Sequence, residues 1–215
     1  NALKFIGDTC LGQVHNPPPP QIVPRVGFYH WDRGAEKQEN REKIPLQNFS
    51  VPKVGILFYR AHYLAGNTAA IDALCQALAD RKLKPVPVFV SSLREIDIQA
   101  ELQAFFRPKN GEEIQLLLNT TSFSVLDFKF SSFDPHQNPK SKIENLDVPI
   151  LQVILSGGTE EEWETGFKGL SPRDMAMNVA LPEVDGKIIS RAISFKAVQS
   201  RHPQLETDVV GYQPR

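Results

Sequence analysis

Apolar positions along the chain form either short continuous runs or one-sided stripes. Four mostly apolar runs are typical of strands that are buried on both faces, and they cover 54–59, 85–90, 114–118 and 150–155. Between the first three runs, apolar residues recur at helical spacing, first at 71, 74, 75 and 78 and then at 98, 102, 105 and 106. This alternation predicts an α/β fold with a mostly parallel sheet and flanking helices, layered as in flavodoxin-like or Rossmann-like proteins.

Both ends of the chain depart from this alternation. Residues 1–50 hold four consecutive prolines, at 17–20, and one short apolar stretch, at 25–31. Because prolines favour an extended backbone and lack N–H donors, this part is predicted to be an irregular, linker-like Pro-rich arm with a short strand. Residues 51–215 are predicted to form the α/β domain.

The segment after the fourth apolar run carries helix and turn signals. Thr159 and Glu162 have the spacing of a capping box. Ser171 and Pro172 predict the start of a helix that ends at Pro182, and 184–187 predicts a hairpin-type turn into a strand over 188–195. The fold is therefore expected to finish in a C-terminal helix-hairpin extension. The segment 128–145 is expected to be irregular.

Polar loops follow the predicted strands, and in open α/β sheets ligands bind outside the carboxyl ends of the strands. The richest loop is 60–67, and we expect His62 to be a catalytic residue there. Residues expected to bind substrate are Arg60, Tyr63, Asn67, Ser91, Ser92, Asn119, Ser156 and Gly157. Backbone N–H groups at 156–159 are expected to suit an anion at a helix N-terminus.

Composition narrows the classes of function. The chain has 24 Lys+Arg and 25 Asp+Glu, so it lacks the basic character of proteins that bind nucleic acid. Its apolar runs are far shorter than the roughly 20 residues of a membrane span. Two isolated cysteines, five scattered histidines and the absence of a recognisable signal peptide predict a cytoplasmic protein without a resident metal site. Phosphate-binding motifs of the G-x-x-x-x-G-K-[ST] and G-x-G-x-x-G types are absent. Since the chain begins at Asn1, we expect it to be a piece of a longer protein.

Four blocks of the sequence resemble the large subunits of the CobN/magnesium-chelatase family. The first block runs from Val54 through the segment His62-Tyr63-Leu64-Ala65-Gly66-Asn67-Thr68, and the others cover 87–93, 169–186 and 201–212. Together they span most of residues 50–215 in family order. The segment after His62 resembles the cobalt branch of the family.

This resemblance implies a tetrapyrrole-binding subunit of an ATP-dependent chelatase. Its partners would be two smaller subunits, one of them an AAA+ ATPase that uses the ATP. In the cobalt branch, Co²⁺ is a substrate and is inserted into hydrogenobyrinic acid a,c-diamide on the way to cobalamin. In the magnesium branch, Mg²⁺ is inserted into protoporphyrin IX for chlorophyll.

Metal insertion must remove protons from ring nitrogens and hold the side arms of the ring. From loop position, we expect His62 to accept a proton or hand over the metal, Arg60 to bind a carboxylate arm and Asn67 to bind an amide. The isolated piece is expected to be inactive. Two alternatives remain open, which are a non-catalytic scaffold that docks the ATPase and a free-standing sensor domain for a small molecule.

Overall fold

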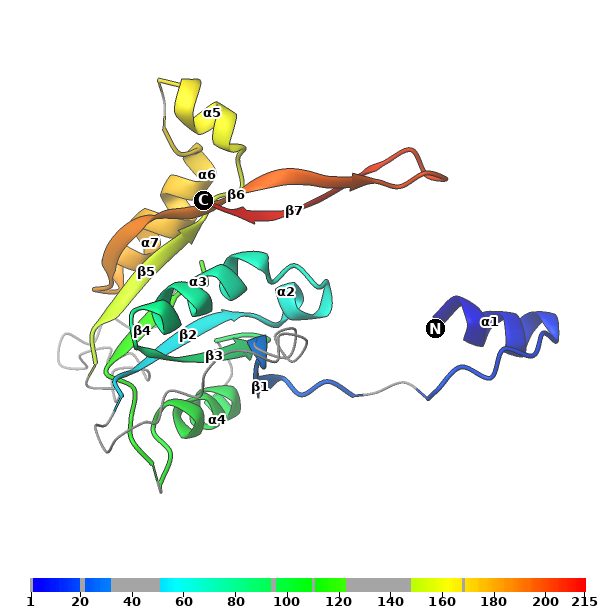
Figure 1. The fold of residues 1–215 in the computed structure, drawn as a ribbon, viewed down its shortest axis with the longest axis horizontal. Helices are drawn as coiled ribbons and strands as arrows, with labels where there is room; N and C mark the ends of the chain where they lie inside the picture. Colours follow the sequence, from blue (N-terminus) through cyan, green and yellow to red (C-terminus); the bar gives the residue numbers. More distant parts are fainter. Residues whose placement is uncertain are drawn as a thin grey trace, which may run out of the picture.

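A computed structural model describes residues 2–19, 22–31, 51–93, 96–109, 111–122, 148–167 and 169–215. Its described strands form one curved sheet in the order β1-β3-β2-β4-β5-β6-β7 (Figure 1). The strands are β1 (Val26–Phe28), β2 (Lys53–Tyr59), β3 (Lys84–Val90), β4 (Leu116–Asn119), β5 (Ile150–Leu155), β6 (Ile188–Arg201) and β7 (Asp208–Pro214).

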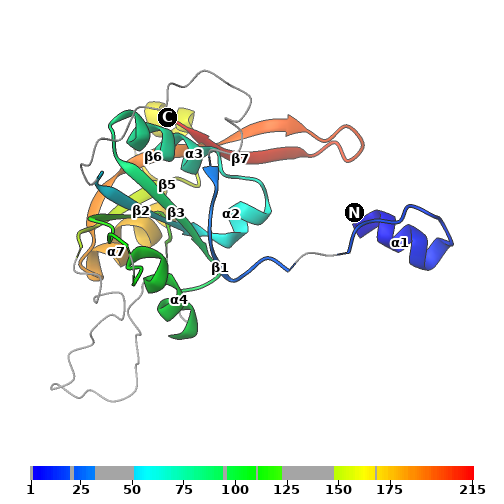
Figure 2. The same ribbon diagram turned by 60° about the horizontal axis from the view of Figure 1, so that its bottom comes forward.

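Helices lie on both faces of this sheet. In both ribbon views α3 lies over one face of β2 and β3, and α4 lies over the opposite face (Figure 2). The helices are α1 (Ala2–Leu11), α2 (Arg60–Leu64), α3 (Ala69–Asp80), α4 (Ile96–Phe106), α5 (Glu160–Thr165), α6 (Pro172–Asp174), the π-helix η2 (Met175–Ala180) and α7 (Leu181–Val184). None of these helices has the length and apolar character of a transmembrane segment.

The sheet is mixed, with parallel pairs in its middle and an antiparallel pair at each edge. The neighbouring pairs β3–β2, β2–β4, β4–β5 and β5–β6 are parallel, whereas β1–β3 and β6–β7 are antiparallel. These findings confirm the α/β class. The flavodoxin-like or Rossmann-like layering stays a prediction, because residues 123–147, which connect β4 to β5, lie outside the described residues. The domain boundary near residue 50 also stays a prediction.

Strand β2 is buried on both faces, as its apolar run predicts. Leu57 packs with residues of α4, while Ile56 and Phe58 pack with residues of α3, and all three are at most 1% exposed. Alternate side chains of one strand therefore join the two halves of the core. This burial holds rigid the carboxyl end of β2, from which α2 begins.

Gly55 in β2 provides a test of this packing. Replacing it with alanine is expected to destabilise the protein by about 1–3 kcal/mol, because the core has no room for another methyl group. A Cβ at this position would lie 2.8 Å from Ile114 Cδ1 and 3.0 Å from Leu117 Cδ1 and Phe106 Cε1. Urea unfolding of the chain measures the change. The second substitution Ile114→Val removes the nearest carbon and is expected to recover part of the loss; an unchanged unfolding midpoint in Gly55→Ala would contradict the packing.

Two helix starts agree with the sequence prediction. The Thr159 side chain accepts a hydrogen bond from Glu162 N, and the Glu162 carboxylate accepts one from Thr159 N, which completes the capping box before α5. Ser171 caps α6 by accepting from Asp174 N, with Pro172 at the first helical position. Both caps are local, so sequence spacing alone identifies them.

Three local predictions are wrong. The segment 60–67 is not wholly a loop, because α2 occupies its first five residues. The predicted end at Pro182 is also wrong, since η2 continues directly into α7, which contains Pro182 and ends at Val184. The predicted hairpin turn at 184–187 instead ends α7, where Gly186 adopts φ +73° and β6 then runs parallel to β5. A glycine of positive φ suits both kinds of turn, so the sequence does not distinguish them.

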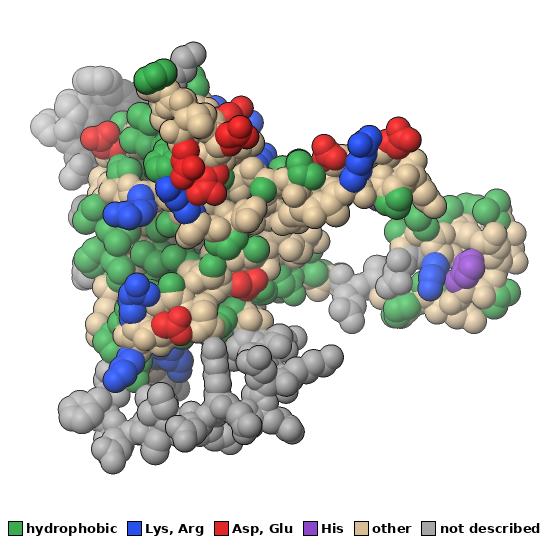
Figure 3. Space-filling model, turned by 45° about the horizontal axis from the view of Figure 1, so that its top comes forward, with side chains coloured by type: hydrophobic (Ala, Val, Ile, Leu, Met, Phe, Trp, Pro, Cys, Tyr) green, Lys and Arg blue, Asp and Glu red, His purple; other side chains and the backbone are tan. Residues whose placement is uncertain are grey.

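The N-terminal arm is not irregular throughout, because α1 precedes the prolines and the arm continues without regular structure over 12–19. Both ribbon views place α1 away from the sheet, and Figure 3 shows apolar side chains spread around it. Leu3, Phe5 and Leu11 are 83%, 58% and 71% exposed. The sequence did not predict this helix, because the prolines dominate the pattern of residues 1–24.

Candidate functional site

The polar segments predicted to bind a ligand follow β2, β3, β4 and β5. Because these strands run parallel, their carboxyl ends lie at the same edge of the sheet. Strands β3 and β4 flank β2 on opposite sides, so the chain direction of the crossovers reverses at β2, which is where ligands bind in sheets of this kind. The edge beside β2 therefore has the position at which sheets of this kind bind ligands.

His62 is half-buried at this edge and contacts two tyrosine rings, and His62, Tyr59 and Tyr212 are called the His62 cluster below. The His62 ring meets that of Tyr212 on β7 edge-on, with 5.3 Å between centroids, and the Tyr59 ring lies 6.3 Å away. Burial lowers the pKa of His62 below its ordinary value of 6.5, and the nearby positive charge of Lys196 lowers it further. The imidazole is therefore neutral near pH 7 and able to accept a proton.

Asn67 links the two ends of the His62 cluster by hydrogen bonds to the backbone of His62 and Tyr212. Its side-chain oxygen accepts a hydrogen bond of 2.9 Å from Tyr212 N, and its own N–H donates to His62 O at 2.9 Å. The bond to Tyr212 joins residues that are 145 positions apart. In this structure Asn67 therefore positions β7 against α2; its predicted contact with a substrate amide stays a prediction.

The remaining residues after β2 and β3 contact β3 itself or the segment that leads into β1. Arg60 Nη2 donates to Val23 O at 2.8 Å, and Tyr63 stacks on Phe89 with 4.5 Å between ring centroids. Ser91 N donates to Arg25 O, and Ser92 directly follows it, partly buried. The buried atoms Arg60 Nε and Ser91 Oγ have no hydrogen-bond partner within the described residues. The structure thus divides the predicted substrate-binding residues into two groups.

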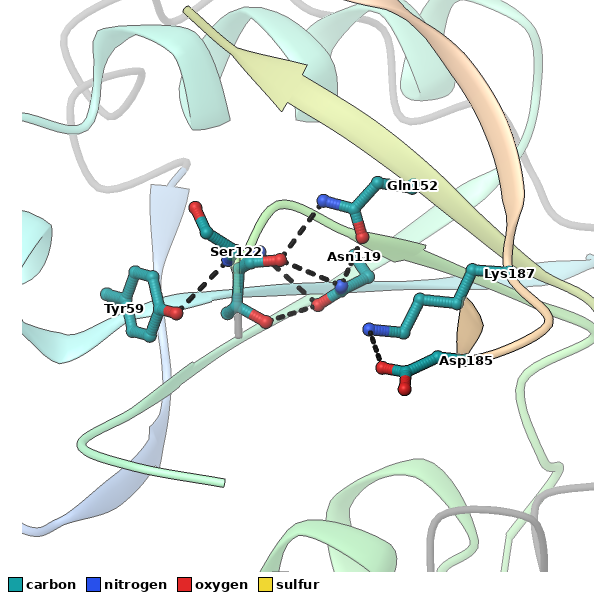
Figure 4. A network of polar contacts seen from close by, with 7 residues as sticks. Tyr59, Asn119, Ser122, Gln152, Asp185 and Lys187 are labelled. Carbon is teal, nitrogen blue, oxygen red and sulfur yellow. Dashed lines mark hydrogen bonds and ion pairs between the residues drawn. The ribbon is translucent and has the colours of Figure 1, made fainter. Parts of the chain in front are cut away.

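Asn119 lies inside the molecule and is 2% exposed (Figure 4). Its Nδ2 donates to Gln152 Oε1 at 2.6 Å and to Thr121 O, while its Oδ1 accepts from Thr121 Oγ1 at 2.7 Å. Next to this network, Ser122 N donates to the Tyr59 hydroxyl at 3.1 Å. Asn119 therefore fixes the end of β4, and binding to a substrate would require it to leave these partners.

Ser156 and Gly157 already hold an anion, which is the carboxylate of Asp174. Ser156 Oγ donates to Asp174 Oδ2 at 2.8 Å, and Gly157 N donates to both carboxylate oxygens at 3.1 and 3.0 Å. Asn178 Nδ2 completes the set at 3.2 Å, and Asp174 is 4% exposed. A substrate anion at these two residues would have to displace the chain's own carboxylate, so their predicted role in substrate binding stays a prediction.

Sequence reasoning did not single out Tyr212, Lys196 or Arg173 as site residues. Lys196 and Tyr212 are a cross-strand pair of the β6–β7 hairpin, and Lys196 Nζ lies 6.0 Å from the centroid of the Tyr212 ring. Burial raises the pKa of Tyr212, and the nearby Asp174 raises it while Arg173 lowers it. No local pattern marks these residues, because Lys196 and Tyr212 come near His62 only through the pairing of β6 with β7 and the bond of Tyr212 N to Asn67.

The His62 cluster combines a neutral imidazole with aromatic rings, and the charges of Lys196 and Arg173 act on it. Aromatic faces suit a flat ring, cations suit carboxylates, and a neutral histidine suits removal of a proton. No group of three or more His, Cys, Asp or Glu within the described ranges is placed to hold a metal ion. The arrangement therefore fits a flat anionic ligand with removable protons.

Comparison with known proteins shows a family match and similar sequences. The family model "CobN/Magnesium Chelatase" matches residues 1–215. The chain is 42% identical over 171 residues to the aerobic cobaltochelatase subunit CobN of Sinorhizobium sp, which is 80% of this chain and 13% of that protein. It is 28% identical over 184 residues to a magnesium-chelatase subunit of Cereibacter sphaeroides, which is 85% of this chain and 15% of that protein.

A solved structure shares the fold. The catalytic subunit of cobaltochelatase from Mycobacterium tuberculosis matches with a TM-score of 0.67 at 26% identity, over 99% of this chain and 16% of that chain. The 215 residues therefore span less than a fifth of the length of each of these relatives.

Proposed function

The chain belongs to the CobN/magnesium chelatase family, and we propose that it forms part of the tetrapyrrole-binding large subunit of an ATP-dependent metal chelatase. The full subunit inserts Co²⁺, its metal substrate, into hydrogenobyrinic acid a,c-diamide during cobalamin synthesis. A separate AAA+ subunit and a second small subunit work with it, and the AAA+ subunit uses the ATP. Activity belongs to this complex, whereas the 215-residue chain alone contributes binding.

The observation that carries this proposal is the His62 cluster, in which a partly buried imidazole contacts two tyrosine rings. A ring nitrogen must lose its proton before the metal binds, and the lowered pKa of His62 keeps its imidazole neutral and ready to accept that proton. The rings of Tyr59 and Tyr212 give the tetrapyrrole an aromatic surface. The cobalt branch is favoured by identity, which is 42% to the CobN relative and 28% to the magnesium-chelatase relative over similar shares of the chain.

A binding titration tests the proposal. The large subunit that contains this chain is titrated with metal-free hydrogenobyrinic acid a,c-diamide and, separately, with protoporphyrin IX, and the absorbance of each tetrapyrrole is followed. We expect saturable binding of the corrin and weaker binding of the porphyrin. A preference for the porphyrin would move the protein to the magnesium branch, and absence of binding to either ring would contradict the proposed function.

A further inference from the structure

Lys196 and Arg173 are exposed cations whose backbone lies near the turn at Gly157 and Gly158, which follows β5. Lys196 N donates to Gly158 O at 2.9 Å, and Arg173 directly precedes Asp174, whose carboxylate is bound by Gly157 N. Both side chains are exposed, and neither forms an ion pair with the part of the chain that the structure describes. In contrast, Arg215 pairs with Glu160 and Glu164, and Arg107 pairs with Glu113.

Acidic groups next to these two cations are already occupied. The Asp174 carboxylate turns inward onto Ser156 and Gly157, and the Glu162 carboxylate accepts from Thr159 N. Neither of these two carboxylates forms an ion pair with Lys196 or Arg173 in the described part of the chain, so both cations can donate hydrogen bonds to a ligand. Such charges attract carboxylates, and Arg in particular binds them with two parallel hydrogen bonds.

An aromatic surface lies beside the cations. The Tyr212 ring lies under Lys196 Nζ at 6.0 Å and contacts the His62 ring at 5.3 Å. Hydrogen bonding of Tyr212 N to Asn67 fixes this strand against α2. The bonds from Lys196 N to Gly158 O and from Tyr212 N to Asn67 Oδ1 therefore fix the backbone of Lys196 and the strand of Tyr212 beside His62. Arg173 is close enough for its charge to act on the Tyr212 hydroxyl.

From this placement we infer that Lys196 and Arg173 are specificity-determining residues that bind carboxylate side arms of the substrate ring, with Tyr212 contacting the ring between them and His62. The inference rests on the proposed function and adds to it a discrimination between charged and uncharged side arms. A ring whose carboxylates are esterified keeps its flat face but loses the charge-assisted hydrogen bonds. The same surface therefore binds the free acid better than the ester.

Matched pairs of ligands test this role. The full large subunit is titrated with a tetrapyrrole carrying free carboxylates and with its methyl ester, in the unmodified protein and in Lys196→Ala, Arg173→Ala and Arg191→Ala. Arg191 is the control, since it is also exposed and unpaired within the described residues, and none of the described contacts of His62 or Tyr212 involves it. Each of the first two substitutions is expected to weaken binding of the free acid roughly tenfold and to leave binding of the ester unchanged.

The outcomes separate this inference from the proposed function. Loss of the preference for the free acid in Lys196→Ala and Arg173→Ala, with Arg191→Ala unchanged, supports the inference. If the unmodified subunit binds the ring but all three variants keep the same preference, the inference is wrong while the proposed function stands. If the unmodified subunit binds neither ligand, the proposed function itself is wrong. Equal weakening of acid and ester would indicate a structural effect and would also overturn the inference.

Discussion

Replacing His62 with alanine is expected to lower the rate of metal insertion by the complete chelatase by roughly 10²- to 10⁴-fold, which is the contribution of a general base. The reason is that His62 is the described group whose pKa and position suit acceptance of a ring proton. Tetrapyrrole binding is expected to weaken only a few-fold, because Tyr212 and the cations remain. Single-turnover assays of insertion, combined with the binding titration, separate the two effects.

The pH dependence gives this prediction a second readout. A histidine acts as a base only in its neutral form, so insertion is expected to fall as the pH drops through the pKa of His62. Because burial lowers that pKa, the midpoint is expected below 6.5. In His62→Gln this acid limb is expected to disappear, since an amide does not titrate in the range.

A matched control is His30→Ala, which removes an exposed histidine whose described ring contact is with Phe28. It is expected to leave both the rate and the acid limb unchanged. An unaltered rate of insertion in His62→Ala would show that another group accepts the proton.

Replacing Lys187 with alanine is expected to destabilise the chain by about 3–5 kcal/mol, the usual cost of removing one member of a buried ion pair. Lys187 Nζ lies 3.3 Å from Asp185 Oδ2, and the two side chains are 5% and 3% exposed. Figure 4 shows the pair at the start of β6. Burial lowers the pKa of Lys187, and Asp185 opposes this shift by attraction. Without the lysine, the Asp185 carboxylate stays buried and loses its cation.

Urea unfolding followed by tryptophan fluorescence measures this loss. The double variant Lys187→Met with Asp185→Asn removes both charges and keeps similar volumes, so it is expected to be much closer to the unmodified chain in stability than Lys187→Ala. The two variants together distinguish an unpaired charge from a lost packing contact. A single variant that unfolds at the same urea concentration as the unmodified chain would show that the pair is not buried in solution.

Local patterns predicted most of the regular elements. The run at 54–59 became β2, the stripe at 71–78 became α3, and the capping box at Thr159 was confirmed. These features depend on residues a few positions apart, so sequence spacing carries them. Elements whose signals were ambiguous were mistaken or missed, as at Gly186, where a helix end resembled a hairpin turn.

The candidate site was only half predictable. The position of His62 at the carboxyl edge of the sheet was predicted from its place after a buried strand, and its catalytic role stays a prediction. The partners of His62 were not predicted, since Tyr212 belongs to a hairpin strand and Lys196 to an exposed position, and neither type of residue signals a ligand by itself. Ser156 and Gly157 were predicted to receive an anion, and the structure places Asp174, 17 residues from Gly157, in that position.

Sequence patterns were enough to predict β1 to β6, the main helices, the two buried faces of β2 and the resemblance to chelatase large subunits. Tertiary structure alone decided which polar groups meet, because that depends on strand order and on antiparallel return of β7 beside β6. Periodicity reports which face of one element is buried, but it is unchanged when the elements are arranged in a different order. The contact between His62 and Tyr212, 150 residues apart, therefore exists only once the sheet has formed.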